Sequence, residues 1–131
     1  VGPLREPHRI EVFIRPENAS ACARLPLQAL SQAIRNLLQN ALDASPKEAM
    51  VTMEVTIAQT DWVIRVIDRG SGMDTETVER IGQPFFTTKS VGQGMGLGVF
   101  LTRNVVRGLG GDLKIQSRPG VGTTISVQIP I

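Results

Sequence analysis

Four groups of residues, set at short regular spacings, could do chemistry in this chain. The first is a pair of asparagines one helical turn apart, Asn36 and Asn40, and the second is Asp68 followed by Gly70 and Gly72. The third is the Phe-Phe-Thr-Thr-Lys run from Phe85 to Lys89, and the fourth is the set of alternating glycines Gly92, Gly94, Gly96 and Gly98. Amide and carboxylate oxygens bind hard cations, while exposed backbone N–H groups and lysine bind phosphate. Together the groups predict a nucleotide site.

The asparagine pair lies on a predicted helix. At 100° per residue, Gln32, Asn36, Asn40 and Asp43 fall within about 80° of one another, opposite an apolar face. Asparagine is unfavourable in the interior of a helix because its amide competes for backbone hydrogen-bonding partners. We therefore expect these amide oxygens to coordinate a cation or contact phosphates. An ordinary solvated face is the alternative.

Asp68 directly follows a predicted strand. A carboxylate there can accept a hydrogen bond from the exocyclic amino group of adenine, and Gly70 and Gly72 would let a flat ring approach the backbone. Guanine presents an acceptor at the same place, so this aspartate would discriminate against it. A turn that simply needs two glycines is the alternative.

The alternating glycines expose amide hydrogens at the start of a predicted helix, which suits triphosphate oxygens, and Lys89 adds a point charge. Neither the Walker pattern G-x-x-x-x-G-K-[ST] nor a dinucleotide G-x-G-x-x-G after the first strand is present. A merely flexible loop is the alternative. Phe85 and Phe86 are more typical of anchors packed into a core than of a stacking platform.

Hydrophobic periodicity predicts the elements that position these groups. We expect a loop from Arg15 to Arg24 and turns at Gln59 to Asp61, Gly110-Gly111 and Pro119 to Gly122. The strands pair locally, and the helices are gathered instead of alternating strictly with them. The predicted strands are His8–Ile14, Met50–Ile57, Trp62–Ile67, Leu113–Ser117 and Thr123–Ile129, and the predicted helices are about Pro26–Ala44, Asp74–Ile81 and Val99–Leu109. This order predicts a two-layer α/β sandwich with a mixed, mostly antiparallel sheet and helices on one face.

Composition limits the possibilities further. With 131 residues, 41% hydrophobic and 20% charged, we expect one domain over residues 1–131. The formal charge of +2 is spread over single basic residues, which argues against a nucleic-acid or membrane-surface footprint. Cys22 cannot form an internal disulfide, so the chain suits a reducing compartment. Because it starts at Val1, we expect a domain cut from a longer protein.

The motifs also carry a resemblance. Asn36-Leu-Leu-Gln-Asn40-Ala-Leu-Asp-Ala44, Asp68-Arg-Gly-Ser-Gly72-Met, Pro84-Phe-Phe-Thr-Thr-Lys89, Gly94-Met-Gly-Leu-Gly98 and Gly120-Val-Gly122-Thr-Thr resemble, in order, the boxes of the catalytic ATP-binding domain of sensor histidine kinases. That domain belongs to a superfamily that includes gyrase-type topoisomerases, MutL proteins and ninety-kilodalton heat-shock chaperones. The resemblance runs from about His8 to the end and implies the Bergerat-type ATP-binding fold.

The resemblance implies a role for each matching position. Asn40 would be the Mg²⁺ ligand, with Asn36 beside it near the phosphates and Lys89 on a phosphate, and these three would serve catalysis. Asp68 would read adenine, in a pocket shaped by its two glycines and supported by Thr123. Residues 87–93 would form a short ATP lid. The further nucleotide contacts would be Asp43, Phe86, Thr88, Gly94, Met95, Gly96, Leu97 and Gly98.

Two positions separate possible activities. The superfamily's ATPases place a glutamate where this chain has Asn36, because hydrolysis needs an activated water, so asparagine fits a phosphodonor better. Many histidine kinases have a lysine where this chain has Asp43, and Lys89 would compensate. A protein serine kinase of the same superfamily, an ATP-driven conformational machine and a non-catalytic ATP-sensing module remain alternatives, although Asn36 and the short lid disfavour the machine.

The implied phosphoacceptor is not in this chain. His8 is the only histidine, and it opens a predicted strand instead of lying in a helical H-E-x-x-x-P context. We therefore expect the acceptor on a histidine-bearing dimerization domain of the same protein, and a response regulator receiver domain as the next partner. The isolated chain would bind Mg·ATP but barely autophosphorylate. We expect a cytoplasmic domain that contacts neither nucleic acid nor the membrane. An anchor in the inner membrane would be compatible with the parent protein.

Overall fold

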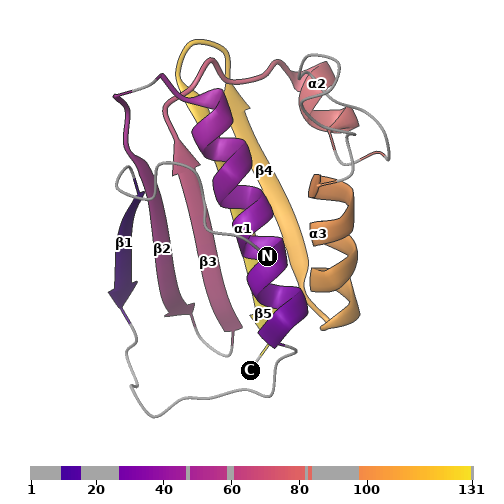
Figure 1. Ribbon diagram of the computed structural model, residues 1–131. Helices are drawn as coiled ribbons and strands as arrows, with labels where there is room; N and C mark the ends of the chain where they lie inside the picture. The colour runs from indigo at the N-terminus through magenta and orange to yellow at the C-terminus, as the bar shows by residue number, and fades with distance from the viewer. Residues whose placement is uncertain are drawn as a thin grey trace.

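The computed structural model describes residues 10–15, 27–46, 48–58, 61–81, 83 and 98–130. Within these residues the chain forms strands and helices in the predicted order (Figure 1). The elements are β1 (Ile10–Arg15), α1 (Leu27–Ala44), β2 (Val51–Ala58), β3 (Asp61–Asp68), α2 (Thr75–Arg80), α3 (Gly98–Gly108), β4 (Asp112–Arg118) and β5 (Gly122–Pro130).

Three residues expected in loops or turns lie in strands. Gly122, expected to end the Pro119 to Gly122 turn, begins β5 and pairs with Arg118. The other two lie in β1 and β3. Arg15, expected in a loop, is the last residue of β1 and pairs with Thr56. Asp61, expected in a turn, begins β3 and pairs with Pro130. In both cases pairing with a neighbouring strand overrides the local preference of the residue.

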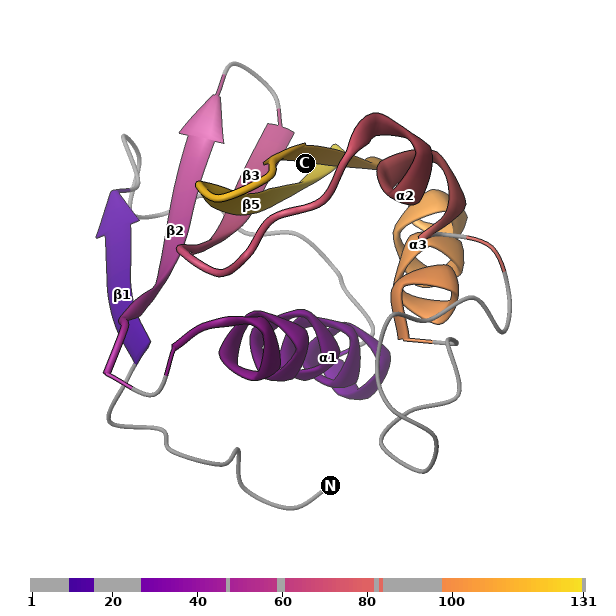
Figure 2. The ribbon, with the colours of Figure 1, turned by 90° about the horizontal axis from the view of Figure 1, so that it is seen from above.

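The strands form one mixed sheet in the order β1-β2-β3-β5-β4. β1 runs parallel to β2, and the other neighbours are antiparallel. Helices α1 and α3 lie on one face of this sheet, with α1 beneath its centre and α3 beside α1, whereas α2 lies beside the sheet near α3 (Figure 2). This architecture confirms the predicted two-layer α/β sandwich.

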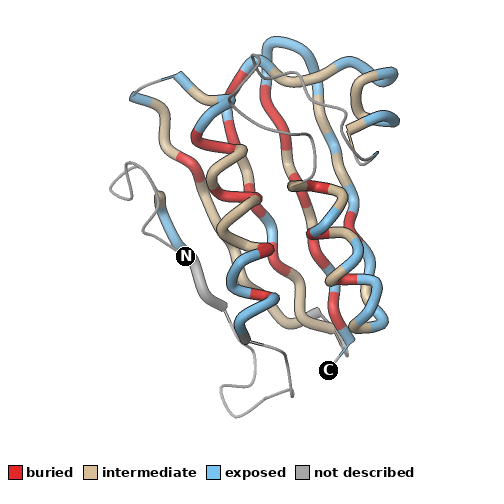
Figure 3. Tube along the Cα trace, turned by 45° about the vertical axis from the view of Figure 1, so that its right-hand side comes forward, coloured by how far each residue is buried: buried red, intermediate tan, exposed pale blue. Residues whose placement is uncertain are grey.

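The core lies between α1, α3 and the sheet (Figure 3). Helix α1 turns a continuous apolar stripe inward because its apolar residues recur every three or four positions. Thr102 of α3 is buried against α1 and its hydroxyl donates to the carbonyl oxygen of Ala33, with 3.4 Å between the oxygens. The buried residues of the stripe are Leu30, Ala33, Leu37, Leu38, Ala41 and Leu42. Among the described helices, none has both the length and the apolar composition needed to cross a bilayer.

One end of the sandwich collects most of the elements that were expected to carry chemistry. The C-terminal ends of α1 and β3, the start of α3, helix α2 and the β4–β5 turn all lie at this end (Figure 1). Helix α1 brings Asn40 there, and β3 ends there at Asp68. The fold therefore brings together groups that are far apart in the sequence.

Candidate functional site

Asp68 is the best-defined polar group at this end of the fold. It is only 8% exposed, and its Oδ1 accepts hydrogen bonds from the backbone N–H groups of Gly70 at 2.9 Å and Thr123 at 3.2 Å. No described residue donates a hydrogen bond to Oδ2. One carboxylate oxygen thus fixes the side chain, and the second oxygen can accept further hydrogen bonds.

Burial has a measurable consequence for this carboxyl. Desolvation raises the pKa of Asp68 above its ordinary value of 3.8, and the hydrogen bonds from Gly70 and Thr123 only partly oppose that rise. No described lysine, arginine or histidine forms an ion pair with it. A buried acid without a cationic partner is costly to keep, and such groups are concentrated at functional sites.

The loop after Asp68 needs two glycines for different reasons. A Cβ on Gly70 would lie 2.2 Å from the carbonyl oxygen of Ala44, at the end of α1. Gly72 has φ of +70°, and a Cβ there would lie 1.9 Å from the carbonyl oxygen of Arg118. Side chains are excluded at both places, and positive φ favours glycine at the second. The loop is therefore wedged between α1 and the β4–β5 hairpin.

Ser117 of β4 connects this loop to the hairpin, and the sequence analysis did not identify it. The backbone N–H of Met73 donates to Ser117 Oγ at 2.8 Å, and Ser117 Oγ lies 3.0 Å from the carbonyl oxygen of Gly122 and 2.7 Å from Thr123 Oγ1. The alternation of β4 gave one available signal. Ser117 shares the inward face with Leu113 and Ile115, where a hydroxyl needs partners.

A hollow of about 710 Å³ opens between α2 and the adjoining ends of β3, β4 and β5. Its volume falls in the range of about 300–1,000 Å³ that is usual for small-molecule sites. Polar and apolar side chains share its wall, among them Asp68, Thr75, Val78, Ile115, Ser117 and Thr123. A flat polar ring could therefore meet Asp68 and Thr123 while its faces meet aliphatic groups.

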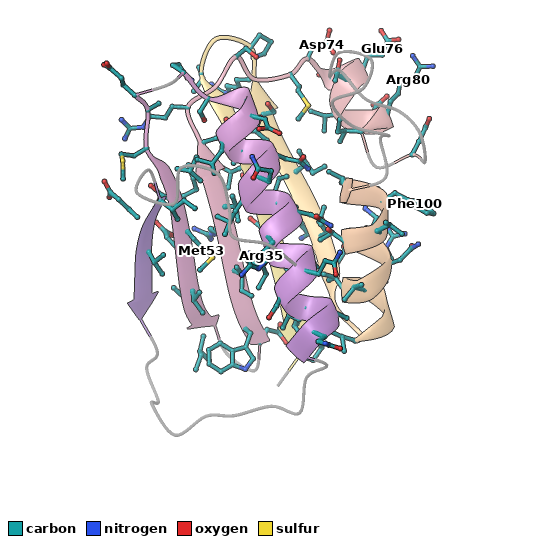
Figure 4. The ribbon with its side chains drawn as sticks, in the orientation of Figure 1. Arg35, Met53, Asp74, Glu76, Arg80 and Phe100 are labelled. Atoms are coloured by element: carbon teal, nitrogen blue, oxygen red, sulfur yellow. The ribbon has the colours of Figure 1, made fainter. Side chains whose placement is uncertain are left out.

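Helix α2 borders this hollow and is held by its own cap. The side chain of Asp74 accepts a hydrogen bond from the N–H of Thr77 at 2.8 Å, and hydrogen bonding from Thr77 lowers the pKa of Asp74. Glu76 and Arg80 form an exposed pair, 3.8 Å apart, and both project outward from α2 (Figure 4). This charged side is the solvent-facing side of the helix.

The predicted polar stripe of α1 is only partly exposed. Asn36 and Asn40 are half-buried, whereas Gln32 and Asp43 are exposed. The amide nitrogen of Asn40 lies 3.4 Å from where a Cβ on Gly98 would stand, so Asn40 adjoins the first residue of α3. Asp43 accepts a hydrogen bond from Gln39 of the same helix at 2.9 Å.

The predicted metal ligand, Asn40, is an amide and does not belong to a carboxylate cage. Within the described part of the chain, no group of three or more His, Cys, Asp or Glu side chains could hold a metal ion. Magnesium commonly binds through one or two protein oxygens and completes its shell with phosphate oxygens and water. The side chain of Asn40, beside the start of α3, carries one amide oxygen of the kind that such a partial shell uses.

Several predicted site residues lie outside the described residues. They are Phe85, Phe86, Thr87, Thr88, Lys89, Gly92, Gly94, Met95, Gly96 and Leu97, together with the predicted lid at 87–93 and with His8 and Cys22. Their roles stay predictions. Of the glycine-rich segment, the structure describes Gly98, which begins α3.

Comparison with known proteins gives a consistent family match. Residues 27–131 match the model of the family described as histidine kinase-, DNA gyrase B-, and HSP90-like ATPase. The chain is 36% identical to sporulation kinase C of Bacillus subtilis over 102 residues, 78% of this chain and 23% of that protein. It is 38% identical to histidine protein kinase DivJ of Caulobacter vibrioides over 109 residues, 79% of this chain and 18% of that protein.

A third relative and a solved structure extend the match. The chain is 37% identical to two-component sensor PprA of Pseudomonas aeruginosa over 131 residues, 95% of this chain and 14% of that protein. The chain thus spans less than a quarter of the length of these relatives. Among solved structures, the catalytic domain of histidine kinase ThkA is similar, with a TM-score of 0.78, 27% identity, and coverage of 93% of this chain and 79% of that one.

Proposed function

The chain belongs to the histidine kinase-, DNA gyrase B-, and HSP90-like ATPase family, and we propose that it is the catalytic domain of a sensor histidine kinase. In this proposal it binds Mg·ATP and donates the γ-phosphoryl group to a histidine on a separate dimerization domain of the parent protein. The observation that carries the proposal is Asp68, a buried carboxyl with one anchored and one available oxygen, in the wall of a hollow.

Asp68 and Thr123 would recognise the base. The available Oδ2 would accept a hydrogen bond from the exocyclic amino group of adenine, and Gly70 and Gly72 keep the adjoining loop thin. Because guanine places an acceptor at that position, it would leave the carboxylate unpaired and repelled. The proposed site therefore prefers ATP to GTP.

Asn40 would hold Mg²⁺ through its amide oxygen, with Asn36 one turn earlier facing the phosphates. When bound, Mg²⁺ would neutralise charge on the phosphate oxygens. Lys89 and the backbone N–H groups from Gly94 to Gly98 would bind the remaining phosphate oxygens, with residues 87–93 as the lid. The further nucleotide contacts of the proposal are Asp43, Phe86, Thr88, Met95 and Leu97.

In the proposed reaction the chain mainly orients the substrate and stabilises charge. A ring nitrogen of the acceptor histidine attacks the γ-phosphorus, a nitrogen–phosphorus bond forms, and the bond to the bridging oxygen breaks, so ADP leaves with the electron pair. A neutral imidazole needs no strong base to attack, which suits an asparagine at position 36. The phosphoryl group would then pass to a receiver domain of a response regulator.

The experiment has two stages. In the first, calorimetric titration of this chain with ATP, with and without Mg²⁺, should show binding that Mg²⁺ strengthens. In the second, the chain is mixed with the histidine-bearing dimerization segment of its parent protein and with labelled ATP, and the phosphate is tested for acid lability. Phosphohistidine is acid-labile, so acid-stable phosphoserine would favour a serine kinase, and ATP binding without transfer would favour a sensing module.

A matched pair of variants sharpens the first stage. Asn40→Ala should remove most of the Mg²⁺ dependence of ATP affinity. Asn104→Ala removes an exposed asparagine from α3 and should leave that dependence unchanged. Equal Mg²⁺ dependence in both variants would contradict the assignment of Asn40 as the metal ligand.

A further inference from the structure

The hydroxyl of Ser117 has three hydrogen-bonding neighbours and only one proton to share. The N–H of Met73 can only donate, and the carbonyl oxygen of Gly122 can only accept, at 2.8 Å and 3.0 Å from Ser117 Oγ. The third neighbour, Thr123 Oγ1 at 2.7 Å, can do either. A serine hydroxyl offers one donor and two acceptor positions.

One arrangement of protons satisfies all three neighbours. Ser117 donates its proton to the carbonyl oxygen of Gly122 and accepts from the N–H of Met73 and from the hydroxyl of Thr123. If Ser117 instead donated to Thr123, its contact with the Gly122 carbonyl would lose its hydrogen. These contacts are part-buried, and only the first arrangement gives each of the three a hydrogen, so that arrangement is favoured. The proton of Thr123 then points at Ser117, away from any ligand.

This arrangement places two acceptors side by side. Asp68 and Thr123 are cross-strand partners, and the N–H of Thr123 donates to Asp68 Oδ1 at 3.2 Å. Both side chains line the hollow, and Ser117 lies next to them in its wall. Asp68 Oδ2 and Thr123 Oγ1 would thus meet a ligand as acceptors.

We propose that Ser117 is a positioning residue that fixes the Thr123 hydroxyl as an acceptor and so makes the hollow select a base with an exocyclic amino group over one with an oxo group. The inference rests on the proposed function and deepens it. An amino group offers two hydrogens to the two acceptors. An oxo group offers only lone pairs, and Thr123 cannot turn to donate to it while its proton is held by Ser117.

The test compares ATP with inosine triphosphate, which has an oxo group at the same ring position and the same sugar and triphosphate. The ratio of the two affinities isolates the base because the phosphate contacts cancel. Calorimetric titration should show that the wild-type chain prefers ATP. Ser117→Ala should lower the ratio of ATP affinity to inosine triphosphate affinity by about tenfold, the scale of one hydrogen bond. Ser117→Thr keeps the hydroxyl and should restore the wild-type ratio.

A double-mutant cycle separates positioning from a structural role. Thr123→Val removes the hydroxyl that Ser117 is said to orient, so adding Ser117→Ala to it should not change the ATP preference further. Ser126→Ala is the matched control, since Ser126 lies on the opposite face of β5 from Thr123 and should leave the preference at its wild-type value. If Ser117→Ala does not fold, Ser117→Cys keeps the size but bonds weakly, and the same loss is expected.

The outcomes distinguish this inference from the function on which it rests. A wild-type chain that binds neither nucleotide would refute the proposed function, and the inference with it. A wild-type chain that prefers ATP, with the preference unchanged in folded Ser117 variants, would overturn only the inference. Additive losses in the double variant would also overturn it, because Ser117 would then act independently of Thr123.

Discussion

Replacement of Asp68 by asparagine should separate nucleotide recognition from folding. Asparagine has nearly the shape of aspartate, and its single carbonyl oxygen can still accept the hydrogen bonds that Gly70 and Thr123 now donate to Oδ1. With that oxygen held in place, the amide nitrogen replaces Oδ2 and turns two donor hydrogens toward the ligand. An adenine amino group would then meet a donor where it now meets an acceptor.

The size of the effect follows from the bond that is lost. A hydrogen bond to a charged group contributes about 1.5–3 kcal/mol, and 1.4 kcal/mol corresponds to about a tenfold change in affinity. Asp68→Asn should therefore weaken ATP binding by about 10-fold to about 100-fold. In the absence of nucleotide the variant should be at least as stable as the wild type, because it no longer buries a carboxyl whose desolvation raises its pKa.

Two measurements on the same samples check this prediction. Calorimetric titration gives the ATP affinity, and denaturant unfolding without nucleotide gives the free energy of unfolding. Asp61→Asn is the matched control, because Asp61 begins the strand that Asp68 ends and lies far from the hollow. Unchanged ATP affinity in Asp68→Asn, or a marked loss of stability together with weaker binding, would refute the reasoning.

Three further predictions concern the same end of the fold. Since burial raises the pKa of Asp68, the folded chain holds that proton more tightly than the unfolded chain, so the free energy of unfolding should fall as pH rises from 3.8 through the folded pKa. ATP affinity should rise over the same pH interval, because the ionised carboxylate is the better acceptor. Measuring the free energy of unfolding and the ATP affinity against pH should show these two slopes in the wild type and not in Asp68→Asn. Asn40→Ala should weaken ATP binding in Mg²⁺ by about tenfold but leave binding in EDTA nearly unchanged, and calorimetry that finds the same loss in both buffers would contradict a metal role. Gly72→Ala should lower the free energy of unfolding by more than about 2 kcal/mol, through positive φ and the clash with a carbonyl, whereas Gly108→Ala, with nothing within 4 Å of its new Cβ, should change it by less than about 1 kcal/mol in the same denaturant titration.

Local patterns were sufficient for most of the architecture. The apolar period of α1 predicted its bounds and its buried face because that period is a property of one segment. Strand alternation likewise predicted β2, β3, β4 and β5 to within two residues at each end. The exceptions were Arg15, Asp61 and Gly122, whose structure depends on pairing with neighbouring strands.

A site residue could be predicted from the sequence where its own side chain indicates a chemical role. It could not be predicted where its role depends on which residues contact it in the fold. Asp68 was predicted as a site residue because a carboxylate at the end of a buried strand, beside two glycines, can accept a hydrogen bond from an adenine amino group. Ser117 was not, because its importance comes from the N–H of Met73, 44 residues earlier, and from the neighbouring strand. Strand alternation placed Ser117 on the inward face of β4 but could not show which partners its hydroxyl meets there, and only the folded arrangement shows that three groups share its single proton.

The end of α1 connects the two halves of the proposed site. Asn40 stands one turn before Ala44, whose carbonyl oxygen lies so close to Gly70 that a Cβ there would be 2.2 Å away. The loop that holds Asp68 is therefore seated on the same helix end that presents Asn40. Ser45 reinforces that end, since its hydroxyl donates to the carbonyl oxygen of Ala41 at 2.7 Å. Packed backbone resists small displacements, so the scaffold sets the spacing between Asp68, proposed to recognise the base, and Asn40, proposed to bind the metal, before a nucleotide arrives.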